Sequence, residues 1–282
     1  MKIFKSKKTF HDYIERQREM GKKIGFAPTM GALHQGHISL YEAASKENDL
    51  VISSIFVNPT QFNNAADLEK YPRNVEKDLK ILENSNFVDA VYLPEVSDLY
   101  PNGLQSKSYD FDGLENEMEG KFRPGHFNGV GTVVEELLRQ AQPDHAYFGE
   151  KDFQQLAIIK KLVEKLKLPV KIHGVAIYRE ANGLAMSSRN ERLSSEQREA
   201  SKVIHETLLK VNEWFRIITI SEINQRVKEI FEDQRGMVLE YFEIADEQTL
   251  KETDFFYTGN QYRAFIVVFV NDVRLIDNVH LD

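Results

Sequence analysis

The chain has 282 residues, of which 41% are hydrophobic and 28% are charged, so it is long enough to form two domains of ordinary globular composition. Its formal net charge of −8 argues against nonspecific binding to nucleic acid or to an anionic membrane surface, although a single site can still carry the opposite charge. The chain has no cysteine, which excludes disulfide bonds and thiol chemistry. No apolar run approaches the length of a membrane span and the first 23 residues contain no apolar leader, so we expect a cytoplasmic protein without a membrane partner.

Strand and helix patterns alternate along the first 178 residues. Short apolar segments predict strands at residues 23–27, 50–57, 88–93, 145–148 and 170–177. Segments of helical periodicity predict helices at residues 38–47, 75–83, 130–141 and 153–167. Several of these strands are apolar on both faces, which is typical of a parallel sheet covered by helices. We therefore expect an α/β domain with a Rossmann-like, doubly wound parallel sheet, in which ligands bind at the carboxyl ends of the strands.

A different pattern follows residue 193. Residues 195–216 predict one helix capped by Ser194 or Ser195, and a second helix is expected near residues 221–233. Strands are predicted at residues 237–244, 263–270 and 273–276, with a hairpin turn at Asn271 and Asp272. These elements predict a smaller α+β C-terminal domain. We expect a boundary within residues 179–194, a first domain of residues 1–185, and a second domain of residues 186–282 that closes over the site.

The most informative segment, residues 28–37, joins the first predicted strand to the first predicted helix. His34 and His37 are three residues apart in the first helical turn, so both side chains are expected to face the same way. Gly36 leaves room for a ligand to approach the backbone. A helix N-terminus supplies unpaired N–H groups and partial positive charge, so this segment predicts a nucleotide triphosphate site. An ordinary histidine pair has the same spacing, whereas a zinc site would lack a nearby Cys or Glu to complete it.

Polar residues follow two other predicted strands and are expected to converge on the same crevice. Asn58 and Gln61 follow residues 50–57, and their neutral amides, like that of Gln155, suit a hydroxylated substrate. Lys151 lies between Gly149 and Asp152 at the start of a predicted helix, where its charge suits a phosphate. At the domain boundary, residues 186–190 offer two hydroxyls and a guanidinium, a set that suits phosphate oxygens but is also common in linkers.

Taken together, these segments resemble the pantoate–β-alanine ligase family of the H-x-G-H nucleotidyltransferase superfamily. The matching segments are residues 28–37, 56–62, 71–73, 123–130, 148–155 and 179–190, in the order and spacing of the family. The chain departs from the family pattern at Asn182, where many members have Asp, and at Glu191 and Arg192, where a Tyr is usual. None of these positions is assigned to chemistry, so the departures concern local loop structure.

The resemblance implies an ATP-dependent condensation of (R)-pantoate with β-alanine to pantothenate, a precursor of coenzyme A. The reaction would pass through pantoyl adenylate and release pyrophosphate and AMP. The resemblance also implies Mg²⁺ bound through the phosphates of ATP, with no certain protein ligand, and a homodimer without a nucleic-acid partner.

The resemblance further implies roles for individual residues. The implied catalytic residues are His34, His37, Lys151 and Arg189. The implied ATP-binding residues are Met30, Gly31, Ala32, Leu33, His34, Gln35, Gly36, His37, Gly149, Glu150, Lys151, Asp152, Tyr178, Met186, Ser187, Ser188 and Arg189. Pantoate is assigned to Asn58, Gln61 and Gln155, and β-alanine to Gln61. Arg123 receives no role, and the glycine-rich segment around residues 117–126 is expected to move as a lid.

Two other functions stay open at this point. Another H-x-G-H adenylyltransferase would transfer AMP to a phosphate instead of a carboxylate, whereas an aminoacyl-tRNA synthetase is disfavoured by the short, acidic chain. A nucleotide-binding sensor without turnover is an alternative from a different class. Formation of a dinucleotide-like product would identify the other adenylyltransferase. ATP binding without pyrophosphate release would identify the sensor.

Overall fold

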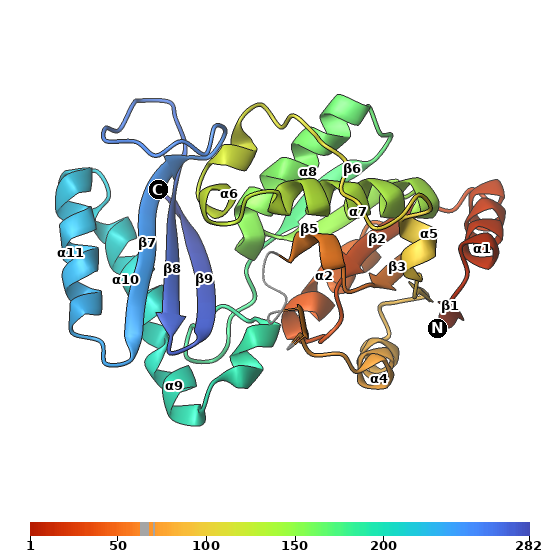
Figure 1. Ribbon diagram of the computed structural model, residues 1–282, viewed down its shortest axis with the longest axis horizontal. Helices are drawn as coiled ribbons and strands as arrows, with labels where there is room; N and C mark the ends of the chain where they lie inside the picture. Colours follow the sequence, from red (N-terminus) through yellow and green to blue (C-terminus); the bar gives the residue numbers. More distant parts are fainter. Residues whose placement is uncertain (63–67, 70) are drawn as a thin grey trace. The chain divides into compact units, whose positions relative to one another are not determined.

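The computed structural model describes residues 1–62, 68–69 and 71–282 (Figure 1). Its contacts divide the chain into two compact units. Unit 1 comprises Met1–Glu150 and Gln154–Ala176, and unit 2 comprises Lys151–Phe153 and Ile177–Asp282. Residues 177–185, which the sequence analysis placed in the first domain, thus make their contacts in unit 2. In the described part of the chain, no helix is both long and apolar enough to cross a membrane.

Unit 1 is built on a six-stranded sheet in which every pair of neighbours is parallel. Its strands are β1 (Lys2–Phe4), β2 (Ile24–Thr29), β3 (Leu50–Ile55), β4 (Ala90–Tyr92), β5 (His145–Gly149) and β6 (Lys171–Val175). The strand order is β1-β4-β3-β2-β5-β6, which confirms the predicted doubly wound sheet. This order reverses at β2, which pairs with β3 on one side and with β5 on the other. Ligands of such sheets bind at the carboxyl ends of the strands that flank this point.

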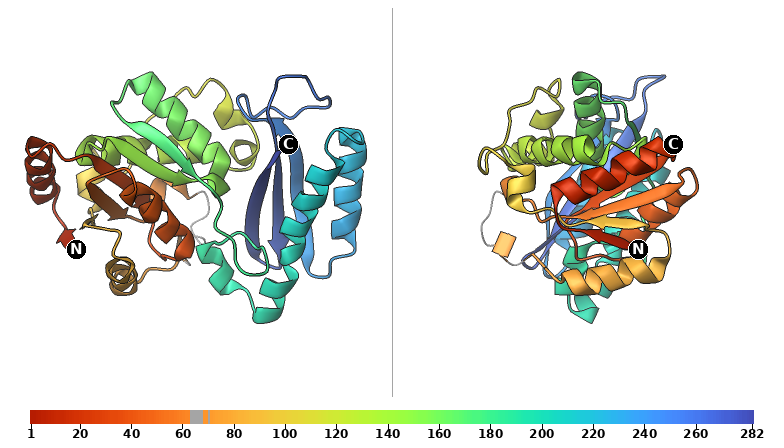
Figure 2. Two further views of the ribbon diagram at one scale, coloured as in Figure 1. Left: turned by 180° about the vertical axis from the view of Figure 1, so that it is seen from behind. Right: turned by 90° about the vertical axis from the view of Figure 1, so that its right-hand side faces the viewer.

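Helices cover both faces of this sheet (Figure 2). The described helices of this part of the chain are α1 (Lys7–Glu19), α2 (Gln35–Ser45), α4 (Val75–Ser85), α5 (Val96–Leu99), α6 (Glu119–Phe122), α7 (His126–Ala141) and α8 (Phe153–Leu166). Adjacent residues of β4 point to opposite faces: Val91 lies in a buried cluster with Leu82 of α4, whereas Tyr92 stacks on Phe10 of α1 with ring centroids 4.2 Å apart. Tyr92 also donates to Gln140 of α7 (2.8 Å).

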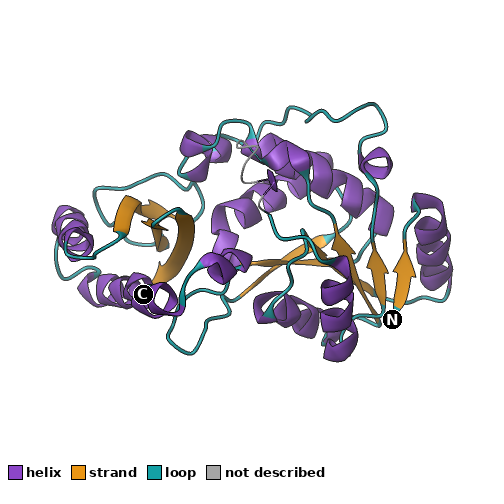
Figure 3. Cartoon of the chain, turned by 60° about the horizontal axis from the view of Figure 1, so that its bottom comes forward, coloured by secondary structure: helices purple, strands orange, loops and turns teal. Residues whose placement is uncertain are grey.

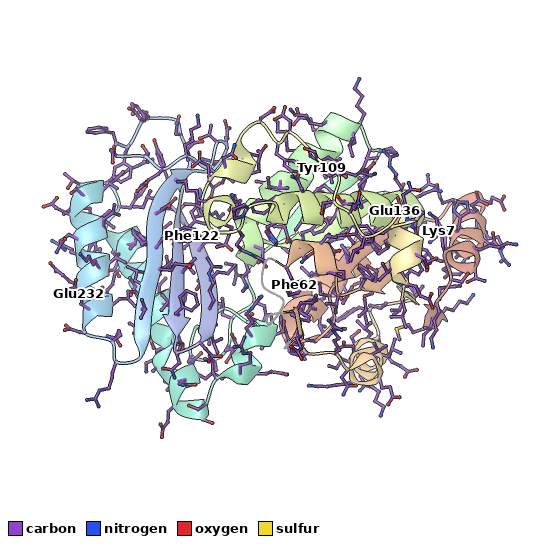
Figure 4. The ribbon with its side chains drawn as sticks, in the orientation of Figure 1. Lys7, Phe62, Tyr109, Phe122, Glu136 and Glu232 are labelled. Carbon is purple, nitrogen blue, oxygen red and sulfur yellow. The ribbon has the colours of Figure 1, made fainter. Side chains whose placement is uncertain are left out.

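The sequence analysis missed α1, although its signal is present. Phe10, Tyr13, Ile14 and Gln17 are buried at the spacing of one helix face. The apolar face is hard to detect in the sequence because the other face of the helix is strongly polar. An ion pair across the surface joins this helix to α7, where Lys7 Nζ lies 2.9 Å from Glu136 Oε1 (Figure 4).

Unit 2 has a three-stranded antiparallel sheet and three helices, as shown by the strands and helices of Figure 3. Its elements are α9 (Ser195–Ala200), α10 (Lys202–Trp214), α11 (Ile220–Glu232), β7 (Met237–Asp246), β8 (Tyr262–Val270) and β9 (Val273–Leu281). One buried cluster contains apolar residues of α10, α11 and the sheet, including Leu208, Val227 and Ile266. The prediction of a small α+β unit with a hairpin at Asn271 is confirmed.

The prediction of a single helix over residues 195–216 is wrong, because the helix divides at Ser201. Ser201 is fully buried, and its Oγ donates to the carbonyl of Gln197 (2.7 Å). A hydroxyl that bonds back to the preceding turn competes with the backbone for that carbonyl and commonly bends or interrupts a helix. Helical periodicity alone does not reveal this break.

A buried carboxylate on α7 generates a prediction about stability and pH. Glu135 accepts hydrogen bonds from Lys107 Nζ (2.8 Å), Tyr109 OH (2.6 Å) and Arg139 Nε (2.8 Å). Burial by itself would raise the pKa of Glu135, but these hydrogen bonds outweigh burial and hold the pKa below its ordinary value. The stabilisation is therefore fully present above the unfolded pKa and is lost as the pH falls through the lower folded pKa.

We expect Glu135→Gln to lower the free energy of unfolding by about 1–2 kcal/mol at pH 6.5, since charge-assisted hydrogen bonds are lost. The difference from wild type should shrink at pH 4.0, where the carboxylate begins to protonate. Urea unfolding at both pH values measures this, with the exposed Glu19→Gln on α1 as the control. An equal difference at both pH values would contradict the assignment.

Candidate active site

The loop between β2 and α2 carries the predicted triphosphate-binding residues. β2 ends at Thr29 and α2 begins at Gln35, with His34 as the extended residue before the first turn. Gly31 and Ala32 both have positive φ, at 81° and 51°, so the chain turns sharply. The predicted strand, turn and helix are therefore all present at the strand where the sheet order reverses.

A carboxylate from α4 holds this loop in place. Asp78, only 2% exposed, accepts the backbone N–H groups of Ala32 (3.0 Å) and Leu33 (2.8 Å). A Cβ on Gly31 would lie 2.8 Å from Asp78 Oδ2, so glycine is required for this close approach. The sequence analysis missed Asp78. Its signal is an acidic residue one turn before the buried Leu82, on the apolar face of a helix.

The two histidines lie side by side, as their spacing predicts. Their ring centroids are 4.1 Å apart, and the backbone N–H of His34 donates to His37 Nδ1 (3.2 Å). An N–H group can only donate, so Nδ1 must carry a lone pair. A neutral His37 therefore has its proton on Nε2, which makes that nitrogen a hydrogen-bond donor.

The side chains after β3 form a buried hydrogen-bond network around Asn58. Its Nδ2 donates to Gln61 Oε1 (3.1 Å) and to Gly129 O (3.1 Å). Its Oδ1 accepts from Thr60 Oγ1 (3.1 Å) and Tyr100 OH (2.5 Å). Both donor and both acceptor positions of the amide are thus in use, so a ligand contact by Asn58 requires an exchange of one of these bonds.

Gln61, in the short 3-10 turn η1 (Pro59–Gln61), differs from Asn58. Its Nε2 donates to the thioether sulfur of Met30 (3.0 Å), which is a weak acceptor. This contact brings the loop after β3 against the loop after β2. The backbone carbonyl of Gln61 bonds Arg123 (3.2 Å) and His126 Nδ1 (2.8 Å). Arg123, to which the sequence assigned no role, thus contacts the backbone of a candidate substrate residue.

The adjacent glutamines at the start of α8 differ in burial. Gln154 is buried, and its Nε2 donates to the carbonyls of Leu114 (2.9 Å) and Glu117 (2.7 Å). Its Oε1 accepts from the backbone N–H of Glu119 (3.0 Å), so Gln154 holds the first part of the predicted lid. Gln155, predicted to bind pantoate, is only partly buried. Motion of the lid stays a prediction.

The remaining predicted phosphate residues belong to unit 2. Lys151 Nζ lies 3.7 Å from Asp152 Oδ2, and the backbone carbonyl of Lys151 accepts from Asn278 Nδ2 (2.9 Å). Ser187 precedes the 3-10 helix η4 (Ser188–Arg192), and its hydroxyl accepts the N–H of Arg189 (3.3 Å). A side chain that caps its own turn in this way orients the hydroxyl and shapes the loop.

The loop that leads to this turn is tied down by polar side chains of unit 2. The N–H of Met186 donates to the carbonyl of Tyr178 (2.9 Å). Asn190, 1% exposed, donates to Glu180 Oε1 (2.7 Å) and to the carbonyl of Ala185 (3.1 Å). Asn182 donates to the carbonyl of Arg198 (3.0 Å), a bond that an ionised Asp at this position could not make.

The predicted site residues are therefore distributed over both units. In unit 1 the structure brings Met30, His34, His37, Asn58 and Gln61 together at the ends of β2 and β3. Gly149 ends β5, the other neighbour of β2, and Glu150 begins the 3-10 turn η3 (Glu150–Asp152). Seven predicted residues belong to unit 2, namely Lys151, Asp152, Tyr178, Met186, Ser187, Ser188 and Arg189, and the others belong to unit 1.

The role of Asp78 can be tested by substitution. Asp78→Ala leaves the N–H groups of Ala32 and Leu33 without their acceptor, and we expect a loss of about 1–3 kcal/mol in the free energy of unfolding. Asp78→Asn retains one acceptor oxygen and should lose less. Chemical denaturation measures both, with Glu83→Ala, an exposed acidic residue on the same helix, as the matched control. Wild-type stability of Asp78→Ala would refute the anchoring role.

The family model for pantoate-beta-alanine ligase matches residues 2–280. The pantothenate synthetase of Flavobacterium psychrophilum is 51% identical over 281 residues, covering 100% of both chains.

Solved structures agree with the sequence comparison. The crystal structure of pantothenate synthetase from Thermus thermophilus matches with a TM-score of 0.90 at 36% identity, covering 99% of each chain. Pantoate-beta-alanine ligase from Francisella tularensis, in complex with beta-gamma ATP and β-alanine, matches with a TM-score of 0.81 at 38% identity. That match covers 99% of this chain and 97% of the other. The chain therefore belongs to the pantoate–β-alanine ligase family and is an enzyme of the ligase class.

Proposed function

We propose that this enzyme condenses (R)-pantoate with β-alanine at the expense of ATP, through pantoyl adenylate, and releases pyrophosphate and AMP. One observation carries the proposal: the paired imidazoles of His34 and His37 lie at the N-terminus of α2, directly after the strand where the sheet order reverses. At such a helix N-terminus, unpaired backbone N–H groups and partial positive charge stabilise a bound triphosphate. The family of this chain makes ATP the expected triphosphate.

The proposed ATP site is built around the donor on His37. Because the backbone N–H of His34 occupies Nδ1, the Nε2–H of His37 is proposed to donate to a phosphate oxygen. Gly149 at the end of β5 supports close approach, since no described atom lies within 4 Å of the position of an added Cβ. Lys151, Ser187, Ser188 and Arg189 supply the remaining phosphate contacts. Met30 to Leu33, Asp152, Tyr178 and Met186 are proposed to hold the nucleotide.

The chemistry explains why the enzyme needs these donors. A pantoate carboxylate oxygen attacks the α-phosphorus of ATP, and pyrophosphate leaves with the bonding electron pair. The free amine of β-alanine then attacks the acyl carbon, AMP leaves, and the nitrogen loses a proton. Correct placement of the carboxylate against the phosphorus can supply ~7–11 kcal/mol of the barrier reduction. Fixed donors stabilise the negative charge that gathers on the phosphates.

ATP is proposed to enter as its Mg²⁺ complex, with the ion held by phosphate oxygens. The residues of the loop fit this arrangement, because imidazole nitrogens and backbone N–H groups are not ligands that Mg²⁺ prefers. The carboxylate oxygens of Asp78 each already accept an N–H group from the loop. The bound ion would neutralise part of the phosphate charge.

Pantoate is proposed to bind Gln61 and Gln155, with Asn58 assigned to the same subsite. Gln61 is the strongest candidate, because a ligand hydroxyl or carboxylate is a better acceptor for its Nε2 than the sulfur of Met30. The network of Asn58, Arg123 and His126 holds Gln61 in position for this exchange. Gln61 is also proposed to contact β-alanine.

Three further proposals rest on the resemblance to the family. They are a homodimer, a cytoplasmic location, and closure of residues 186–282 over the site. Analytical ultracentrifugation of the purified chain decides the first of these.

Pyrophosphate exchange into ATP tests the proposed reaction. With Mg²⁺ and pantoate present and β-alanine absent, we expect exchange that depends on pantoate, because adenylate formation is reversible. His37→Ala should raise the adenylation barrier by ~2–4 kcal/mol, as for other charge-stabilising donors. His11→Ala, on a surface turn of α1, is the matched control. ATP binding without exchange or single-turnover adenylate formation would favour a sensor, and a dinucleotide-like product would favour another adenylyltransferase.

A second substitution separates substrate binding from nucleotide binding. Gln61→Ala should weaken the binding of pantoate by tenfold or more while it changes ATP binding by less than threefold. The reason is that the amide of Gln61 is assigned to pantoate and not to ATP. Isothermal titration with each ligand measures this, and Gln225→Ala on the exposed face of α11 is the matched control. Equal weakening of both ligands would count against the assignment.

A further inference from the structure

A second group of chemistry-bearing side chains lies near the other end of α2 from His34 and His37. Glu47 follows the last turn of α2, His145 begins β5, and His173 lies in β6. Each can present one ligand atom, and these three atoms lie within 4.8 Å of one another. All three residues belong to unit 1.

The sheet register explains why these residues meet. β5 and β6 pair in parallel, with Tyr147 opposite His173 and His145 two residues before Tyr147. His145 and His173 therefore share the face that α2 covers, and their ring centroids are 4.8 Å apart. Tyr147 stacks on His173 with an interplanar angle of 17°, which fixes the orientation of that imidazole.

The donor atoms converge on the carboxylate of Glu47. Its Oε2 lies 3.5 Å from His145 Nδ1 and 4.0 Å from His173 Nε2. His173 Nε2 is buried and has no hydrogen-bond partner in the part of the chain that the structure describes. Buried polar atoms nearly always have a partner, so this nitrogen indicates a place for a ligand.

We propose that Glu47, His145 and His173 form a binding site for a divalent transition-metal ion, with Zn²⁺ as its typical occupant. Two imidazole nitrogens and one carboxylate oxygen form a ligand set that Zn²⁺ commonly takes, with a water molecule in a fourth position. Tetrahedral bonds of about 2.0–2.2 Å place ligand atoms roughly 3.3–3.5 Å apart, so the three ligand atoms, which lie within 4.8 Å of one another, must draw closer when an ion binds. Glu47 is half exposed, so its carboxylate can move toward both imidazoles.

The protonation of the imidazoles suits a metal ion. Burial is the main cause that lowers the pKa of both His145 and His173, which favours the neutral form that a metal ion requires. The charged groups that influence them are of both signs: Lys23 and Lys171 lower these pKa values and Glu47 raises them. Because net charge gives little attraction, affinity must come from the nitrogen ligands, which favours Zn²⁺ over Mg²⁺ or Ca²⁺.

A bound ion would link the end of α2 to β5 and β6. The opposite end of α2 begins directly after His34, and β5 ends at Gly149. The metal site is thus separate from the proposed ATP site, although it lies on elements that carry residues of that site. Its occupancy does not depend on the proposed reaction.

Titration of Zn²⁺ alone into the metal-free full chain tests this proposal, with a chromophoric chelator as competitor. We expect one zinc equivalent that is weakened at least tenfold in Glu47→Gln and in His173→Phe, the second of which keeps an aromatic ring against Tyr147. His11→Ala is the matched control. His11 Nε2 also lies beside a carboxylate, that of Glu15 at 3.1 Å, on the surface of α1. Zinc should also raise the melting temperature of the wild type but not of Glu47→Gln.

His34→Ala separates this site from the histidine pair at the start of α2. Loss of the zinc equivalent in His34→Ala, with wild-type binding in His173→Phe, would overturn the proposal. Absence of micromolar zinc binding in the wild type would overturn it as well. Glu47→Gln changes a half-exposed side chain, so we expect this variant to fold. It therefore still tests the proposal if the His173 variant does not fold.

Discussion

The buried carboxylate of Asp78 fixes the loop on which the rest of the site depends. It accepts the N–H groups of Ala32 and Leu33, and it reaches them because Gly31 has no side chain in the way. The loop in turn sets the position of His34 and thereby the start of α2. The proposed triphosphate site at this helix end needs this support, because donors stabilise developing charge only when they are already in place. One carboxylate on α4 thus determines the geometry of two imidazoles far away in the sequence.

The same principle of prior placement applies to the side chains after β3. Asn58 uses all of its hydrogen-bonding capacity on Gln61, Gly129, Thr60 and Tyr100. Its amide therefore holds these residues in place. Gln61 keeps one amide donor on a thioether, which a better acceptor readily replaces. The contrast separates the residue that organises the subsite from the one suited to contact a substrate. Gln154 is likewise committed to the backbone of residues 114–119, whereas its neighbour Gln155 is only partly buried.

Much of the fold follows from local sequence pattern, and the exceptions have physical causes. The alternation of apolar strands and periodic helices predicts the parallel sheet, and residues 28–37 predict the helix N-terminus with its two histidines. The pattern missed α1 because its polar face dominates the composition of that segment. It also joined α9 and α10, because the bond from Ser201 to Gln197 interrupts the helix without changing its periodicity. The local sequence pattern shows which face of a helix or strand is apolar. It does not show the hydrogen-bond partner of a single polar side chain.

The sequence by itself determined the fold class, the family and the identity of the histidine pair, since the alternation of elements, the order of the motifs and the His34–His37 spacing can all be read along the chain. Only the tertiary structure decided that Asp78 anchors the loop, that Asn58 is saturated, and that Glu47, His145 and His173 meet. These contacts depend on strand order and register, which bring distant residues together at distances that no local periodicity encodes. The physical reason is that the polarity pattern of the sequence reports only on neighbouring residues. Buried polar groups, by contrast, form hydrogen bonds with residues that are distant in the sequence.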